Sequence, residues 1–475
     1  MTLSPSVQTT RHRLAKHYLT KLQQANATIR RGRGNRDHWL NQMQQDWAQI
    51  KHWQAWAAAG KEQDTERARL CATFPVDTAD VLRVRQTPTE QFVWAKEALE
   101  AAQRLGDKET ELLMLYQVAM LSLTIEALDE ANHHAQNFLE RAEASGDPLS
   151  VGRAWYVLAS DAFTRGIFDK AEEYFNKCLP LLEACNAVDE MPVIWRGLGR
   201  LAQFRGNYEQ ARTNFLRFLD AALKSGNEQN ILDANMALSG IYLALRDYVT
   251  AEEHAHRAVA IARNFGMSRW FPPALLSLAH AEKWQGKLED ACAHYEEAIA
   301  PARLVCAPST LINGLYGLGQ ARFRLGEYEV ALTHFEEALA LAQSAQLPLR
   351  FCEVVHDMVY AHVALQQWDT ARLRLREALA AAQKLGTPHF QTKTVAAAVT
   401  LWHNCGDHQQ AAVWAGLLKK HTTNLHPSLF ESIVYEKLEH KLGAERYRQL
   451  IELGNALTLD NVIVEVSHLL GDTSE

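Results

Sequence analysis

The segment Gly166-Ile-Phe-Asp-Lys-Ala171 decides the fold, because close variants of it return every 40 residues along the chain. The next copy is Gly206-Asn-Tyr-Glu-Gln-Ala211, and a later one is Gly326-Glu-Tyr-Glu-Val-Ala331. The closing alanine stands at positions 131, 171, 211, 251, 291, 331, 371 and 411. Chance would give such a series on the order of once in ten thousand chains or less, so the chain is built from a true repeat.

Each 40-residue unit carries the helical period of apolar residues twice. In the unit of Ala171 we expect a first helix over about 148–164, a turn at 165–167 and a second helix over about 169–184. A core Leu or Met recurs 13 residues before the alanine, and the small residue after it allows two helices to approach closely. The pattern predicts an all-α, right-handed superhelical solenoid of about eight helical hairpins, with atypical capping helices at both ends.

This pattern resembles the tetratricopeptide repeat, which places Trp or Leu, Leu and a small residue on its first helix, and Ala and Phe on its second. The matching positions in two units are Trp155, Leu158, Ala159, Ala171 and Phe175, and then Trp195, Leu198, Gly199, Ala202, Ala211 and Phe215. The resemblance covers about residues 87–420. The unit here has 40 residues where the family has 34, so both helices gain roughly half a turn to a turn, and the usual closing Pro is missing.

The two ends of the chain depart from the repeat. We expect a basic, Trp-rich helical segment at 1–60, a degenerate first repeat at 61–106, the repeat array at 107–426 and capping helices at 427–475. Within the last segment, helices are expected around 438–453 and 458–470. Terminal repeats of a solenoid are atypical because one face meets water and has no neighbouring repeat.

A second resemblance lies in these ends. Leu442-Gly-Ala-Glu-Arg-Tyr447 and Gly454-Asn-Ala-Leu-Thr-Leu-Asp460 look like the closing segment of bacterial signal-transducing (STAND-type) NTPases with C-terminal tetratricopeptide sensors. Trp47-Ala-Gln-Ile50, followed by Trp56, is similar to the helical segment after the winged helix of those proteins. No G-x-x-x-x-G-K-[ST] motif is present, so the resemblance is to the sensor region without the NTPase domain. We therefore expect no binding or hydrolysis of ATP.

Composition and motifs argue against an enzyme. The sequence is 47% hydrophobic and 22% charged, as in folded soluble proteins, and no apolar run approaches the roughly 18 residues of a membrane span. Its seven cysteines form no C-x-x-C pair, and its closest histidines lack metal-ligand spacing. No hydrolase, dinucleotide-binding or kinase motif occurs. We expect a cytoplasmic, non-enzymatic protein with no cofactor, no metal site and no membrane partner.

The N-terminal segment is strongly basic. Residues 1–60 carry nine Lys or Arg against Asp37 and Asp46, whereas the rest of the chain is net acidic. We predict that Arg30, Arg31 and Arg33 dock on an acidic partner protein. A nucleic-acid contact is the less favoured alternative, because this run has no interleaved aromatic residues and no helix-turn-helix or zinc-finger spacing accompanies it.

The residues that flank the core columns of the first helices form the candidate ligand site. In tetratricopeptide solenoids such positions line the concave groove, and here they combine cations with aromatic rings, the side chains that anchor peptides and carboxylates. For any single residue, gap filling between helices is an equal alternative. The candidate groove residues are Arg153, Tyr156, Arg196, Arg200, His280, Lys283, Trp284, Tyr316, Gln320, Arg324, His356 and Tyr360.

These features indicate a sensor or regulatory subunit that binds a protein segment, peptide or effector in its groove and controls a partner protein. An NTPase or a protease-like effector is one candidate for that partner. Three alternatives stay open: a peptide-pheromone-type receptor, a passive assembly scaffold and a nucleic-acid-associated transcriptional regulator.

Overall fold

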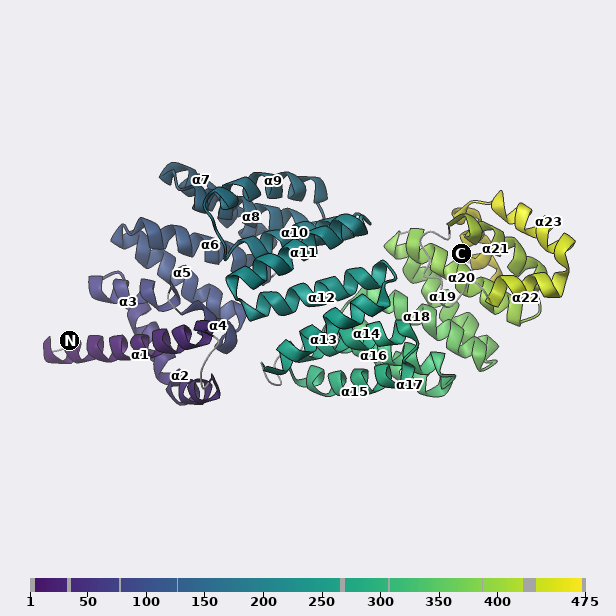
Figure 1. Cartoon of the computed structure of the whole chain (residues 1–475), viewed down its shortest axis with the longest axis horizontal. Coiled ribbons are helices and arrows are strands. Elements are labelled where there is room, and N and C mark those ends of the chain that lie inside the picture. Colours follow the sequence, from purple (N-terminus) through teal and green to yellow (C-terminus); the bar gives the residue numbers. More distant parts are fainter. Residues whose placement is uncertain are drawn as a thin grey trace. The chain divides into compact units, whose positions relative to one another are not determined.

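The computed structural model describes residues 5–31, 36–76, 78–125, 127–264, 270–305, 308–386, 388–421 and 433–471. Within these ranges the chain forms 24 α-helices and no strand (Figure 1). The helices belong to two compact units, residues 1–234 and 235–475, whose boundary falls inside helix α12 (Glu228–Ala244). Among the described helices, none is long and apolar enough to cross a membrane.

The second helices of the repeats begin 40 residues apart throughout the array. They are α5 (Pro88–Leu105), α7 (Leu128–Ser145), α9 (Phe168–Ala184), α11 (Tyr208–Ser225), α13 (Tyr248–Asn264), α15 (Leu288–Val305), α17 (Tyr328–Ser344), α19 (Trp368–Leu385) and α21 (His408–His421). The helix predicted at about 169–184 is therefore confirmed as α9. The regular start follows from the turn before each helix, where residues such as Gly166 and Gly206 adopt positive φ values of 76° and 74°.

The first helices alternate with them to make eight hairpins within the described residues. They are α6 (Lys108–Thr124), α8 (Pro148–Thr164), α10 (Met191–Phe204), α12, α14 (Phe271–Gln285), α16 (Pro308–Arg324), α18 (Pro348–Ala364) and α20 (Pro388–Asn404). Asp107 and Asp147 cap α6 and α8 with side-chain oxygens, and Pro148 and Pro348 open α8 and α18 with a suitable fixed φ. The first helix expected over about 148–164 in the unit of Ala171 is confirmed as α8.

The alanine column forms the centre of the helix packing. All eight alanines from Ala131 to Ala411 have no exposed surface. The aromatic side chain four residues later packs on a small residue of a first helix: a Cβ added to Gly199 would lie 2.4 Å from the Phe215 ring, and one added to Gly319 would lie 2.5 Å from the Phe335 ring. The close approach that the columns predicted is therefore present, and it holds the two helices of a hairpin together.

The first unit begins with helices outside the 40-residue register: α1 (Pro5–Arg31), α2 (Arg36–Ala59), α3 (Thr65–Val76) and α4 (Ala79–Arg85). They share a core that includes Trp53, Phe74 and Trp94, the last from the repeat helix α5. Trp94 stacks on Trp47 with ring centroids 6.3 Å apart. The aromatic residues of this segment thus attach the N-terminal helices to the first repeat.

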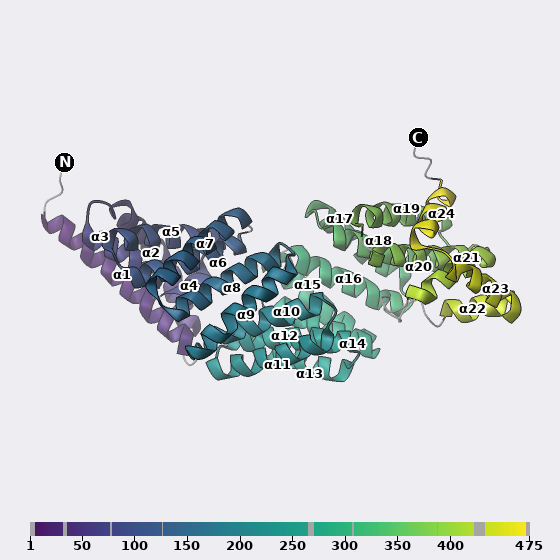
Figure 2. The same ribbon diagram turned by 90° about the horizontal axis from the view of Figure 1, so that it is seen from above.

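The second unit closes with α22 (Ile433–Leu442), α23 (Ala444–Asn455) and α24 (Leu459–Leu469), and Figure 2 shows α24 beside α19 and α20. One helix was predicted around 438–453, and this is wrong: Gly443 breaks the segment, with φ 78° and ψ 148°. Glycine reaches such values without steric cost, so the chain turns there. The next helix begins at a capping box formed by Thr458 and Asn461.

Candidate functional site

Polar side chains join consecutive first helices at a constant sequence separation of 37 residues. In the first unit Arg153 pairs with Glu190, and Arg196 Nη1 lies 3.3 Å from Asp233 Oδ2. In the second unit Lys283 bonds to Gln320, which bonds to Asp357. This separation is three residues shorter than the 40-residue repeat, and three residues are close to one helical turn. Each first helix is therefore staggered by about one turn against the next. Several candidate residues are therefore bound to partners within the chain.

Arg200 differs from two arginines near it in the first unit, Arg165 and Arg205. The residue is exposed, its guanidinium carbon lies 4.9 Å from the centroid of the Phe163 ring, and no ion pair of Arg200 occurs among the described residues. Arg165 contacts Asp129 and Asp161, and Arg205 contacts Asp169 and Glu172. The neighbouring guanidinium charges are thus neutralised within the chain, while the charge of Arg200 is not.

Aromatic rings form the surface around Arg200. The rings of Phe163, Phe168 and Phe204 contact one another with centroids 5.4–5.7 Å apart. Phe204 is 62% exposed, and Ile167, which precedes Phe168 in the chain, and Tyr208, the first residue of α11, are also exposed. We call Phe163, Ile167, Phe168, Arg200, Phe204 and Tyr208 the Arg200 patch. An exposed apolar cluster of this kind is typical of an interaction surface.

The second unit holds a buried polar chain. The Lys283 amine, 3% exposed, donates to Gln320 Oε1 at 2.6 Å, and Gln320 Nε2 donates to Asp357 Oδ2 at 2.7 Å. Burial lowers the pKa of Lys283 to about 8, whereas it raises the pKa of Asp357 against the opposing effect of its partners. The Tyr316 hydroxyl also hydrogen-bonds to Asp357, and burial raises the pKa of Tyr316 well above its usual value. These groups form one network across α14, α16 and α18.

A small cavity lies against this network. Its volume is about 20 Å³, which is room for a single water-sized group. Arg324 covers it: Nη1 donates to the Lys283 carbonyl at 2.5 Å, and the guanidinium carbon lies 5.7 Å from the Trp284 ring centroid. Five candidate residues line this cavity together with Phe323, Phe335 and Asp357; they are Lys283, Trp284, Gln320, Arg324 and Tyr360.

Three candidate residues lie partly or wholly in the interior. Tyr156 is 6% exposed beside Phe175, and His356 is 2% exposed between the Cys352 carbonyl and the Thr394 hydroxyl. His280 accepts or donates a 2.5 Å hydrogen bond with the Tyr295 hydroxyl. Burial lowers the pKa of both histidines to about 3, so both are neutral near pH 7. Packing accounts for these positions.

The basic N-terminal cluster lies at the edge of what is described. Arg33 and the side chains of Arg30 and Arg31 are outside the described residues. Other cations of this segment bind acids of the same unit: Lys16 lies 2.5 Å from Glu66, and Lys21 lies 2.8 Å from Asp46. Part of the basic charge therefore serves to hold α1 on its neighbours.

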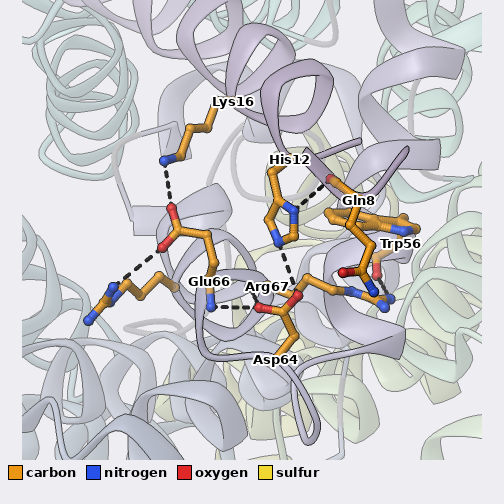
Figure 3. Close-up of polar contacts among 8 residues, drawn as sticks. Gln8, His12, Lys16, Trp56, Asp64, Glu66 and Arg67 are labelled. Atoms are coloured by element: carbon orange, nitrogen blue, oxygen red, sulfur yellow. Dashed lines mark hydrogen bonds and ion pairs between the residues drawn. The ribbon is translucent and has the colours of Figure 1, made fainter. Parts of the chain in front are cut away.

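Figure 3 shows the contacts around Lys16 and His12. His12 Nε2 lies 3.0 Å from Asp64 Oδ2, while its Nδ1 lies 2.8 Å from the Gln8 carbonyl. The Arg67 guanidinium covers the Trp56 ring at 4.3 Å and bonds to the Trp56 carbonyl. The contacts join α1, α2 and α3 into one body. Within the described residues, no three His, Cys, Asp or Glu side chains group as a metal ion requires.

The sequence did not indicate Phe163, Phe204 or Asp357 as site residues. Phe168 and Tyr208 belong to an aromatic column that continues through Tyr248, Tyr328 and Trp368 at the repeat spacing, and this column was a usable signal. Phe204 stands in a mixed column, in which Thr164, Trp284 and Arg324 occupy the same repeat position. Comparison of equivalent positions in the repeats therefore does not single out Phe204. Its large exposed surface does, and that is known only from the structure.

Family models described as the tetratricopeptide repeat match residues 196–264 and 272–344. Among solved structures, a Rap protein complexed with Competence and Sporulation Factor is 14% identical with a TM-score of 0.53, and the match covers 76% of this chain and 99% of that one. The apo form of the quorum sensor NprR from B. thuringiensis is 15% identical with a TM-score of 0.54, with the same coverages. No curated protein sequence matches the chain.

A STAND protein with a tetratricopeptide repeat sensor from Pyrococcus horikoshii is 17% identical with a TM-score of 0.54. The match covers 78% of this chain and 55% of that protein, so this chain corresponds to about half of it. At such identities these likenesses establish the fold. The family models identify tetratricopeptide repeats within residues 196–344, and the solved structures show that the array has the same fold.

Proposed function

We propose that this tetratricopeptide-repeat chain is a non-enzymatic regulatory subunit that binds a segment of a partner protein on the first helices of its repeats and so controls that partner. One observation carries the proposal: the guanidinium of the exposed residue Arg200 lies over the Phe163 ring and has no acidic partner among the described residues. Arginine and aromatic side chains are the groups that most often dominate binding energy at protein interfaces.

The chemistry of the Arg200 patch defines the segment it fits. A carboxylate can accept two parallel hydrogen bonds from a guanidinium, and an apolar side chain beside it can cover the exposed ring of Phe204. We therefore infer an acidic segment with an adjacent aromatic or aliphatic residue. The second unit offers a related group, because Arg324 is exposed beside Trp284, whose ring stacks on Tyr248 at 6.4 Å.

A free peptide as ligand is the main alternative, and it has support of its own. The structurally similar Rap protein was solved with Competence and Sporulation Factor, and NprR is named as a quorum sensor. In the second unit, Gln320 is half-buried and links three first helices. A backbone amide of a bound peptide could take the place of one of its hydrogen-bond partners. In that case a short peptide would bind the purified chain without any partner protein.

Affinity capture with the full chain tests the proposal. Arg200→Glu with Phe204→Ala removes the charge and the ring, whereas Arg104→Glu makes the same charge change on the exposed face of α5. We expect the wild-type chain and the Arg104 variant to capture the same partner. The patch variant should bind that purified partner at least about tenfold more weakly in calorimetry, a loss of about 1.4 kcal/mol.

The competing site is the basic end of the chain. Reversing Arg30, Arg31 and Arg33 to Glu should leave capture unchanged if the Arg200 patch is the binding surface. If the patch variant keeps every partner while the basic-end variant loses them, the binding site lies at the N-terminus and the proposal is wrong.

A further inference from the structure

Helix α10 starts out of register with most of the other first helices, and among the described first helices it shares its late start with α14. Helices α8, α12, α16, α18 and α20 begin at positions 148, 228, 308, 348 and 388, so the repeat predicts a start at 188. Four of these helices open with proline, but in α10 the proline is displaced to Pro192 and the helix begins at Met191. Residues 185–190 instead form turns, with Asn186 at φ 49°. About one helical turn is therefore missing at this point.

The missing turn leaves a pocket in the first unit. Its volume is about 490 Å³, within the range of small-molecule sites, and it lies between α9, α10 and α11. The buried side chains of Leu182, Ala187 and Ala221 belong to its lining, beside the half-buried Met191 and Trp195. Arg217 contributes a guanidinium to the same lining.

The preceding repeat contains the same cation–aromatic pair in a neutralised form. Lys177 lies over Trp155 at 4.5 Å, and one repeat later Arg217 lies over Trp195 at 4.7 Å. Lys177 is neutralised by Glu173, 2.7 Å away and four residues earlier on the helix. The position equivalent to Glu173 is Thr213, which cannot neutralise Arg217.

Two acids line the pocket, Glu183 and Asp220, and neither takes over that role among the contacts of the described residues. Asp220 is used by Lys224, at 2.7 Å on the same helix. Arg217 has no ion pair among the contacts of the described residues. A guanidinium held against a Trp ring without a counter-ion, at the edge of a pocket with apolar residues in its wall, suits a carboxylate that carries an apolar group.

We propose that this pocket binds an organic carboxylate with an aromatic or aliphatic body. The body would lie against Trp195 and Met191, and the carboxylate would pair with Arg217. This chemistry can come from a free organic acid or from the C-terminal residue of a peptide. The site is independent of the Arg200 patch, because Arg217 belongs to α11 and the lining contains none of the patch residues.

Calorimetry on the full chain tests the site with two probes, hydrocinnamate for a free acid and N-acetylphenylalanine for a peptide C-terminus. We expect at least one to bind in the roughly millimolar range or better. Its neutral amide should bind at least about tenfold more weakly, because it cannot form the ion pair with Arg217. Which acid binds identifies the source of the ligand.

Two variants locate the binding without disturbing the core. Arg217→Thr removes the guanidinium, and Thr213→Glu installs the acid that Lys177 already has in the preceding repeat. An (i, i+4) pair with the acid first is the favoured orientation on a helix. Both changes should weaken binding at least about tenfold, whereas Lys177→Thr should leave it unchanged. The proposal is overturned if neither acid binds at concentrations up to about 10 mM. It is also overturned if the acid binds both variants as tightly as it binds the wild type.

Discussion

Gly416 and Gly454 face each other where α21 and α23 cross. A Cβ added to Gly454 would lie 1.8 Å from the Val413 carbonyl oxygen, and one added to Gly416 would lie 2.3 Å from the Ile451 carbonyl oxygen. Both clashes are with backbone, which cannot rotate away as a side chain can. The contact therefore depends on the absence of a side chain at both positions, and it attaches the closing helices to the last repeat.

Gly454→Ala should destabilise the second unit by about 1–3 kcal/mol, because the helices must separate to admit the methyl group. The measurement is the melting temperature or the urea midpoint of the full chain. Gly240→Ala is the matched control, since nothing lies within 4 Å of an added Cβ there. That change lies inside α12 and should stabilise by about 0.5–1 kcal/mol. Equal effects from the two substitutions would contradict the close crossing.

The alanine column gives a second test of the packing. Ala251 has no exposed surface, so Ala251→Trp should overpack the helix crossing and cost about 1–3 kcal/mol. Val249, two residues earlier and 63% exposed, provides the control Val249→Trp. We expect thermal melting to show a lower midpoint for the first variant and little change for the second. An unchanged midpoint for Ala251→Trp would mean that the column is not at the centre of the packing.

The repeat made much of this fold predictable from sequence. A 40-residue period fixes where second helices begin, and the alanine and aromatic columns identify the buried faces, because the same neighbours recur around each of them. The late start of α10 was also visible, since Pro192 stands four residues beyond the position that proline takes in four other units. The break at Gly443 was less visible, because a single glycine inside a helical pattern is compatible with a continuous helix.

The candidate site was harder to predict for a physical reason. Position on a helix shows which face a side chain belongs to, but its partner depends on the stagger between neighbouring helices. That stagger brings Arg196 to Asp233 and leaves Arg200, four residues later, without an acid among the described residues. The same stagger places neighbouring side chains over His356, which is buried although it lies on a first helix. Sequence spacing alone does not separate these outcomes.

The buried His356 predicts a loss of stability in acid. Its pKa is about 3 in the folded chain, below the usual value of 6.5, because burial disfavours the imidazolium. Above pH 6.5 the histidine is neutral in both states. As the pH falls below 6.5 the unfolded chain takes up the proton and the folded chain does not, so stability decreases down to about pH 3. At pH 5 the loss from this group is about 2 kcal/mol.

Urea unfolding of the wild type and of His356→Gln at pH 7.5 and pH 5 measures this contribution. The wild type should lose about 2 kcal/mol more than the variant on acidification, because glutamine does not titrate. Other buried histidines, such as His280, act equally in both proteins and cancel in the difference. Equal losses in the two proteins would show that His356 does not remain neutral on folding.

Gln320 has a central place in the buried chain, because it accepts from Lys283 and donates to Asp357. Gln320→Leu would leave a buried ammonium and a buried carboxyl group without this partner, and we expect a cost of about 1–3 kcal/mol for each group that stays unsatisfied. Gln320→Glu keeps an acceptor for Lys283 but places a second carboxylate against Asp357. It should therefore be destabilising at pH 7 and recover part of its stability near pH 5, when the carboxylate pair takes up a proton. The leucine variant introduces no acid, so relative to wild type it should show no such recovery. Urea unfolding of both variants and the wild type at the two pH values measures the difference. A glutamate variant that fails to recover in acid would show that Asp357 and residue 320 are not coupled as the 2.7 Å contact implies.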